Sequence, residues 1–347
     1  MKEIIKITVI FLLFSICSCS ENKNNILDFK NTQKIDVECF VIPYSDILGV
    51  SLQLLKKDCL LLINDFHGDS LIHVFDLKNN IEHNKLFSKG VGPNEFISPL
   101  AIYMTDSVIY IYERQSSRLF SFSAENLLAD NKEITRKFTL DRSSNILFPL
   151  TDSMFISSDI DDGMKRFGVY NNVGEKVNEF GEYHDYWYKE NDFPNRVRAF
   201  YHLTFFEKHP SEKMFVAYSG HILGIYNYES INQTPILLKE FLLSKYEYMF
   251  VNNDMMLSTE RSDGIERGII AVSCSSKYIY IVYNPNKEGR DNKLTHNIQI
   301  IDWNGKPISI INTNKKISCL TIDETEHRGY IIAEDPEDTL MYFTWEK

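Results

Sequence analysis

The residues best suited to binding chemistry lie in one segment, residues 183–210. It places an indole (Trp187), two guanidinium groups (Arg196 and Arg198) and an imidazole (His202) among several tyrosines and phenylalanines. Aromatic rings stack on flat ligand faces, and guanidinium groups donate paired hydrogen bonds to ligand oxygens. We therefore predict that these four side chains form a recognition site at one mouth of the fold. The competing interpretation is that the aromatic residues only pack over the end of a sheet.

Charged residues that follow short apolar runs form a second group of candidates. Asp65 and His67 are predicted to contribute to a ligand-binding rim of mixed charge. Further members of this rim are Asp69, Glu113, Arg114, Arg118, Asp159, Asp161, Asp162, His221, Glu288, Arg290, Asp291, Glu334, Asp335, Glu337 and Asp338. Since aspartate also stabilises turns through local hydrogen bonds, a structural role is the alternative for each of them.

Signatures of familiar catalytic sites do not occur in the sequence. It contains no H-E-x-x-H, G-x-S-x-G or P-loop motif, which are the patterns of zinc proteases, serine hydrolases and nucleotide-binding proteins. Residues 159–163 (DIDDG) begin like a calcium loop but lack the ligand pattern that ends in glutamate. We therefore predict no metal and no cofactor, and we assign no catalytic residue.

A repeated unit of short strands carries the candidate residues. Residues 105–110 read TDSVIY and residues 151–156 read TDSMFI, which is one polar turn and one apolar strand repeated 46 positions apart. Similar units recur about every fifty residues, a period typical of propeller blades. The first residues of the six marker strands are Cys59, Val108, Met154, Met214, Tyr278 and Tyr330. The strands are rich in β-branched and aromatic residues, so the sequence predicts an all-β fold, a six-bladed β-propeller.

The two ends of the repeat predict how the ring closes. The last unit supplies only three strands before the chain ends, whereas residues 35–42 (IDVECFVI) form a strand without a unit. We expect this strand to pair with residues 340–345, to complete the last blade and to close the ring, which removes unpaired sheet edges. Residues 241–257 are expected to form a short helix or a loop within an insertion.

The innermost strands of a propeller line its central channel. The expected inner strands read SLQLL, LAIYM, ILFPL, RAFYHL, IIAVSC and ISCLTID, and only Asp323 in the last of them is a carboxylate. Calcium-dependent lactonases place several carboxylates on one axial metal, so most of those ligands are missing. The other polar residues expected to line the channel are Gln53, Arg198, His202 and Ser273.

Two stretches carry a family resemblance. Residues 87–96 (FSKGVGPNEF) resemble the linker of NHL-type repeats and of TolB-like six-bladed propellers, which are common in Gram-negative lipoproteins. The tail, GYIIAEDPEDTLMYFTW, is similar to the last blade of that lipoprotein family. The resemblance implies a propeller over about residues 35–347 and implies little about function.

The N-terminus is predicted to be an export signal. Lys2 and Lys6 flank the start of an apolar run, residues 7–14, which is too short to span a bilayer. The following Ile-Cys-Ser-Cys resembles a bacterial lipobox, which implies lipidation of Cys19 and, with Ser20 next to it, sorting to the outer membrane. We predict a signal peptide over residues 1–18, a lipidated tether over 19–34 and the propeller over 35–347. A plain secretory signal is the alternative.

The net charge of the chain argues against one class of partner, nucleic acid. The formal charge is −11 and no block of basic residues is present, so we predict that the protein does not bind nucleic acid. The sequence favours a non-catalytic binding or scaffold propeller on the cell envelope, with a protein or a glycan as ligand. The alternative is a propeller hydrolase or lyase for a carbohydrate-type substrate that uses Arg196, Arg198 and His202 with a rim carboxylate.

Overall fold

A computed structural model describes most of the chain from Leu27 to Glu346. The described residues are 27–44, 48–66, 68, 70–83, 86–92, 95–97, 99, 101–128, 133–141, 144–159, 165–183, 193–230, 233–244, 248–253, 256–261, 266–287, 294–335 and 337–346. No helix among them is long and apolar enough to cross a membrane.

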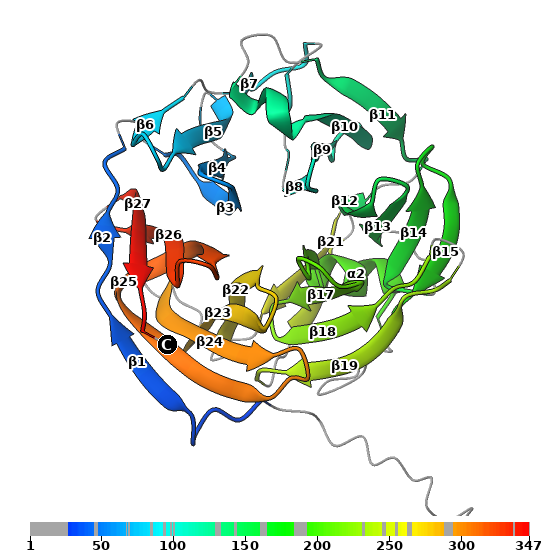
Figure 1. Cartoon of the computed structure of the whole chain (residues 1–347). Coiled ribbons are helices and arrows are strands. Elements are labelled where there is room, and N and C mark those ends of the chain that lie inside the picture. The colour runs from blue at the N-terminus through cyan, green and yellow to red at the C-terminus, as the bar shows by residue number, and fades with distance from the viewer. Residues whose placement is uncertain are drawn as a thin grey trace, which may run out of the picture.

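Six antiparallel blades surround a central channel (Figure 1). Blade 1 contains β3 (Ser51–Lys57), β4 (Leu60–Asp65) and β5 (Ser70–Asp76), with β6 (Ile81–Glu82) and β7 (Leu86–Ser88) on its outer side. Blade 2 contains β8 (Ile102–Met104), β9 (Val108–Glu113), β10 (Arg118–Ser123) and β11 (Thr135–Thr139), with the short helix η1 (Ala124–Leu128) after β10. Blade 3 contains β12 (Ser144–Thr151), β13 (Met154–Asp159), β14 (Phe167–Asn171) and β15 (Lys176–Phe180).

The remaining blades follow the same plan. Blade 4 contains β16 (Phe205–Lys208), β17 (Met214–Ser219), β18 (Ile222–Asn227) and β19 (Ile236–Leu242). Blade 5 contains β22 (Glu266–Cys274), β23 (Tyr278–Lys287), β24 (Thr295–Asp302) and the first half of β25 (Pro307–Asp323). The second half of β25 is the inner strand of blade 6, where it pairs with β26 (Arg328–Glu334), which pairs with β27 (Asp338–Thr344). The predicted six-bladed propeller is confirmed.

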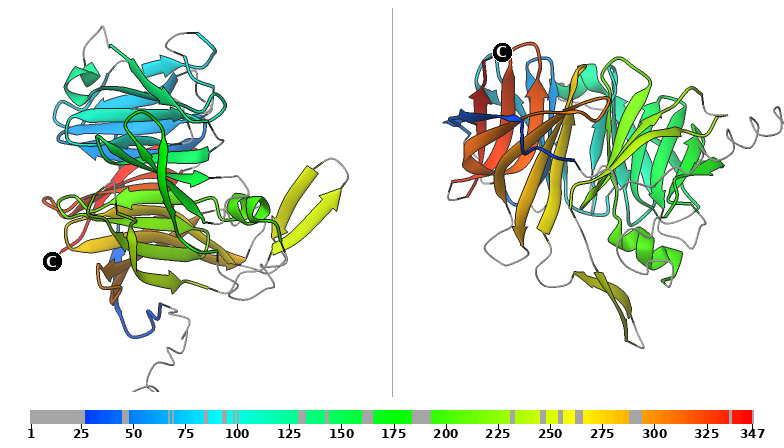
Figure 2. Two further views of the ribbon diagram at one scale, coloured as in Figure 1. Left: turned by 90° about the vertical axis from the view of Figure 1, so that its right-hand side faces the viewer. Right: turned by 90° about the horizontal axis from the view of Figure 1, so that it is seen from below.

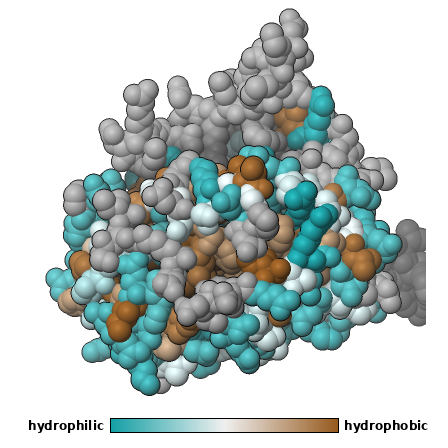
Figure 3. Space-filling model, turned by 90° about the horizontal axis from the view of Figure 1, so that it is seen from above, coloured by the Kyte–Doolittle hydropathy of each residue, from teal (hydrophilic) through white to brown (hydrophobic). Residues whose placement is uncertain are grey.

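Apolar side chains fill the interfaces between neighbouring blades. The second strand of each blade lies between two sheets, so a strand such as β4 is buried along almost its whole length. Six buried clusters join consecutive blades around the ring, and one of them packs Tyr330 and Leu340 of blade 6 on Leu61 and Phe75 of blade 1. Burial of this kind stabilises the fold by about 1.5–3 kcal/mol for each large apolar side chain. One side of the ring is mostly hydrophilic, with hydrophobic side chains gathered near the middle of that face (Figure 3).

The N-terminal segment joins the last blade, with bounds that differ from the prediction. β2 (Phe40–Val41) pairs antiparallel with β27 as the fourth strand of blade 6, and the Ile42 backbone N–H donates to Leu340 O at 2.9 Å. β1 (Gln33–Val37) instead lies parallel to the first half of β25, on the outer edge of blade 5. Residues 35–42 are therefore not one strand, because the chain crosses from one blade to the next near Cys39.

Two predicted elements differ in kind. The run expected to form an inner strand (RAFYHL, residues 198–203) spans the end of a helix, α2 (Asn195–Tyr201), and the two residues after it, and the inner strand of blade 4 is β16 instead. The expected helix or loop at residues 241–257 contains the end of β19 and much of a hairpin, β20 (Tyr248–Asn253) and β21 (Met256–Arg261). α2 and the β20–β21 hairpin project together from one face of the ring (Figure 2), and α2 contacts β21.

Candidate functional site

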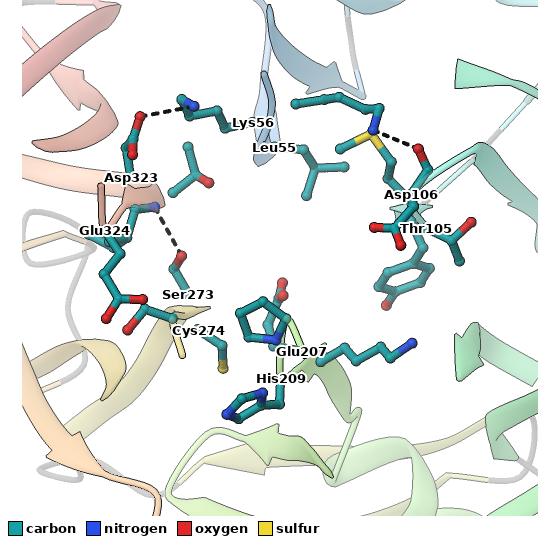
Figure 4. Close-up of a pocket in the computed structure, with 18 of the residues that line it drawn as sticks. Leu55, Lys56, Thr105, Asp106, Glu207, His209, Ser273, Cys274, Asp323 and Glu324 are labelled. Carbon is teal, nitrogen blue, oxygen red and sulfur yellow. Dashed lines mark hydrogen bonds and ion pairs between the residues drawn. The ribbon is translucent and has the colours of Figure 1, made fainter. Parts of the chain in front are cut away.

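The turns that join the first and second strands of the blades meet around one end of the channel. They surround a cavity of about 550 Å³, which we call the hairpin mouth (Figure 4). All six blades line it, with Lys56, Lys57, Asp58, Tyr103, Thr105, Asp106, Phe148, Pro149, Glu207, Lys208, His209, Ser273, Cys274, Ser275, Asp323 and Glu324 among the lining residues. Since turns alternate between the two ends of successive antiparallel strands, the loops between second and third strands lie at the other end of the channel.

Lysines of the hairpin mouth are held by neighbouring blades. Lys56 Nζ lies 2.9 Å from Asp323 Oδ2. Lys57 Nζ donates to the backbone oxygen of Asp106 at 2.6 Å, and Lys208 Nζ donates to that of Leu150 at 2.7 Å. Burial acts to raise the pKa of Asp323, but hydrogen bonds from Lys56 and from backbone N–H groups hold that pKa below its usual value.

His209 is fixed as a structural side chain between blades 4 and 5. Its Nδ1 accepts hydrogen bonds from the backbone N–H groups of Ser211 (3.1 Å) and Glu212 (2.9 Å). Its Nε2 lies 3.1 Å from Ser276 O. Since a carbonyl oxygen only accepts, Nε2 carries the proton and the ring is neutral in this arrangement. Ser276 in turn donates to Glu324 through its backbone N–H (2.9 Å) and its hydroxyl (2.7 Å).

Glu207 differs from the other charged groups. Its side chain is partly exposed to the channel and lines both the hairpin mouth and a second cavity of about 50 Å³. That second cavity lies further along the inner strands, between Leu52–Leu55 of β3 and Cys319–Leu320 of β25. Among the described residues, the Glu207 carboxyl group has no hydrogen bond and no ion pair.

Burial raises the pKa of Glu207 to about 8. Tyr103, Tyr218 and Cys274 lie near it, and burial raises the pKa of each of these side chains as well, so they stay neutral around pH 8. A carboxyl group of perturbed pKa in a cavity is a common mark of a functional site. Figure 4 shows Glu207 inside the ring of residues that line the mouth.

Among the described residues of the mouth, these groups are not paired with one another as catalytic groups are. Catalysis needs a base and an electrostatic stabiliser within hydrogen-bond reach of one reacting atom. Among the described residues of the mouth, the lysines and His209 are held by other protein groups, and Glu207 has no partner that would act with it. Within the same part of the chain, no three His, Cys, Asp or Glu side chains lie close enough to hold a metal ion.

The predicted recognition site in residues 183–210 is only partly described. Arg198 and His202 are both buried, one helical turn apart at the end of α2, whereas Arg196 is exposed. The Arg198 guanidinium stacks over the Tyr183 ring at 4.7 Å, and its Nη1 donates to Asn195 Oδ1 at 3.2 Å. These contacts place Arg198 and His202 in the insertion, whereas the sequence predicts them on an inner strand. The prediction that they bind a ligand remains a prediction.

Asp65 has a structural role at the end of β4. It is fully buried, and its carboxylate accepts hydrogen bonds from the backbone N–H groups of Gly49 (2.7 Å), Val50 (2.9 Å) and Gly68 (3.0 Å). Glu113 repeats this arrangement in blade 2, where it accepts from the Ile97 N–H at 2.6 Å. These carboxylates fasten the incoming linkers to the second strands, so a ligand at Asp65 would have to replace several hydrogen bonds.

Two polar residues of the predicted channel lining join neighbouring inner strands. Gln53 Oε1 accepts from the Ile102 N–H at 2.7 Å, and Ser273 Oγ accepts from the Ile322 N–H at 3.1 Å. Their hydrogen bonds join blade 1 to blade 2 and blade 5 to blade 6. Other candidates lie outside the described residues, namely Cys19, His67, Trp187 and the rim residues Asp69, Asp161, Asp162, Glu288, Arg290 and Asp291.

Sequence comparison places the chain in a family. The TolB-like 6-blade propeller-like family matches residues 28–325. The chain belongs to this family. The match covers blades 1 to 5 and the inner strand of blade 6, and it ends just past β25, so the TolB-like relationship rests on the propeller itself. No curated protein matches the sequence.

Solved structures share the propeller fold at low sequence identity. A Bacteroides fragilis protein described as exported is 12% identical, with a TM-score of 0.58, over 91% of this chain and 99% of its own. The calcium-binding protein regucalcin from Agrobacterium tumefaciens is 11% identical, with a TM-score of 0.50, over 90% of this chain and 95% of its own. The U3-55K structure is 8% identical, also with a TM-score of 0.50, over 88% of this chain and 97% of its own. These likenesses show the propeller fold alone.

Proposed function

We propose that this protein is an exported, lipid-anchored TolB-like propeller that binds a protein segment or a glycan in the hairpin mouth without transforming it. The observation that carries the proposal is a polar cavity of about 550 Å³ to which all six blades contribute. Its lysines and His209 are positioned by bonds between blades, so they present a fixed set of donors and acceptors to a ligand. Such preorganisation lowers the entropic cost of binding.

Binding is tested by screening envelope glycans and peptides against the intact protein and against Lys56→Ala. Loss of this lysine removes a positioned hydrogen-bond donor and frees Asp323 from its fixed place, and we expect the affinity of a ligand that contacts this pair to fall about tenfold, the usual scale for a charged hydrogen bond. Lys315→Ala is the matched control, because Lys315 forms a comparable pair with Asp335 (2.7 Å) at the opposite end of the same strand segment of β25.

Equal affinity in the wild type, Lys56→Ala and Lys315→Ala would place the ligand elsewhere on the protein. Turnover of a bound glycan would contradict the non-catalytic proposal and would support the hydrolase or lyase alternative.

The proposed anchor depends on Cys19. Cys19→Ala is expected to abolish acylation, so that the protein leaves the detergent phase in a detergent-partitioning assay. Mass analysis of the mature N-terminus checks the site directly. An unmodified start at another residue would disprove the lipobox, and the propeller proposal would then stand without its anchor.

A further inference from the structure

We propose that Glu207 binds the ammonium group of a lysine side chain that enters the channel through the hairpin mouth. The inference rests on the proposed function, because it assigns a ligand class to the same cavity. It begins from a carboxyl group that lines both channel cavities and, among the described residues, has no hydrogen bond and no ion pair. A carboxyl group that is only partly exposed to water is costly to ionise unless it is paired, so this position favours a ligand that supplies the partner.

The dimensions of the two cavities favour a slender cation. The hairpin mouth, at about 550 Å³, admits a peptide side chain with its flanking groups, whereas the cavity beyond Glu207 measures only about 50 Å³. A cavity of this kind needs about 10–15 Å³ to hold one water molecule, so the inner space suits an ammonium head better than a sugar ring. A lysine side chain has this shape, with one compact charge at the end of a narrow alkyl stem.

Charges around the mouth favour a cation as well. Five carboxylates line it (Asp58, Asp106, Glu207, Asp323 and Glu324), against three lysines (Lys56, Lys57 and Lys208). His209 is neutral by its hydrogen bonds. The mouth therefore carries a net negative charge when Glu207 is ionised.

Aromatic rings near Glu207 complete the site. Tyr103 packs edge-on to Phe148 with ring centroids 4.7 Å apart, and Phe205 stacks on Tyr218 at 5.9 Å. Phe205 and Tyr218 line the inner cavity together with Glu207. Aromatic faces attract ammonium groups, and the attraction is stronger where water is excluded.

Proton release should accompany binding. Burial raises the pKa of Glu207 to about 8, so the free carboxyl group is largely protonated at pH 6, and an ammonium ion binds its ionised form. The other titratable groups that face it, Tyr103 on β8, Tyr218 on β17, and Cys274 and Cys319 on β22 and β25, have pKa values raised by burial and stay neutral. Affinity should therefore rise about tenfold per pH unit from pH 6 and level off near pH 8.

The test is an NMR titration of the whole propeller with Nα-acetyl-lysine methylamide at pH 6 and pH 8.5. Nα-acetyl-norleucine methylamide is the uncharged control ligand, and n-pentylamine distinguishes a free amine from a lysine in a peptide. We expect the lysine derivative to bind more tightly at pH 8.5 and the norleucine derivative to bind at least tenfold more weakly. Tighter binding of the lysine derivative than of n-pentylamine would identify the source as a peptide.

Glu207→Gln should weaken binding of the lysine derivative at least tenfold at pH 8.5 and abolish the pH dependence. Glu229→Gln removes one negative charge from an exposed ion pair outside the mouth and should have no effect. Equal affinities of Glu207→Gln and the wild type, or the absence of binding by the wild type, would overturn the inference. The proposed function would survive either result if a ligand from the screen still depended on Lys56.

Discussion

A chain that begins at Tyr44 is expected to melt about 10 °C below one that begins at Leu27. The shorter chain lacks β1 and β2, and so exposes the outer edges of β25 and β27. It also loses Ile42, which is buried between blades 6 and 1, and Ile35, which packs on the core between blades 5 and 6. Loss of these contacts costs about 4 kcal/mol at 1.5–3 kcal/mol per apolar side chain, and each kcal/mol lowers the melting temperature by about 2–4 °C in a chain of this size.

Thermal unfolding followed by circular dichroism checks this result. The chain from Leu27 is the control, because it lacks only the residues before the described segment. The propeller should also become more prone to associate once two sheet edges are unpaired. An unchanged melting temperature in the chain from Tyr44 would contradict the role that we assign to the N-terminal strands.

Replacement of Glu207 by glutamine is expected to stabilise the protein at alkaline pH. The pKa of this carboxyl group rises from 4.5 to about 8 on folding because the group is buried. Between these two pH values the unfolded chain releases the proton while the folded chain keeps it, so the wild type loses stability as pH rises from 4.5 towards 8. Glutamine does not titrate, and this loss should disappear in the variant.

The gain in the free energy of unfolding of Glu207→Gln cannot exceed about 5 kcal/mol, since each pKa unit of the shift corresponds to 1.36 kcal/mol. Water in the channel screens part of the effect, so we expect Glu207→Gln to be more stable than the wild type by about 2 kcal/mol at pH 9. At pH 4 the two proteins should be equally stable. Urea unfolding at both pH values measures the difference, and parallel pH profiles of the two proteins would show that Glu207 is solvated like an exposed carboxylate.

The blade plan could be predicted from the sequence because it repeats. A polar turn followed by an apolar strand marks the second strand of every blade, and all six markers, from Cys59 to Tyr330, lie within two residues of the start of such a strand. Local pattern does not determine where an unrepeated segment goes. Residues 35–42 have the composition of a single strand. They nevertheless pair with two different blades, because the path of the chain around the ring decides which edges they meet.

Glu207 was missed because the inner strand of blade 4 was placed too early. The run RAFYHL has strand-like composition, but it spans the end of α2 and the residues after it, and the true inner strand is Phe205–Lys208. A usable signal was present, since the inner strand of a blade directly precedes the turn before the marker strand, and FFEK directly precedes HPSEK and Met214. The composition of the long insertion instead favours Arg198 and His202, which lie in α2 and directly after it.

The most direct test of the account is a crystal structure of the protein soaked with Nα-acetyl-lysine methylamide at pH 8.5. We expect the ligand in the hairpin mouth, with its ammonium group within hydrogen-bond distance of the Glu207 carboxylate and its backbone between the turns of several blades. A ligand bound at the opposite end of the channel, against α2 and Arg198, would contradict the assignment of the mouth and would favour the site expected from residues 183–210.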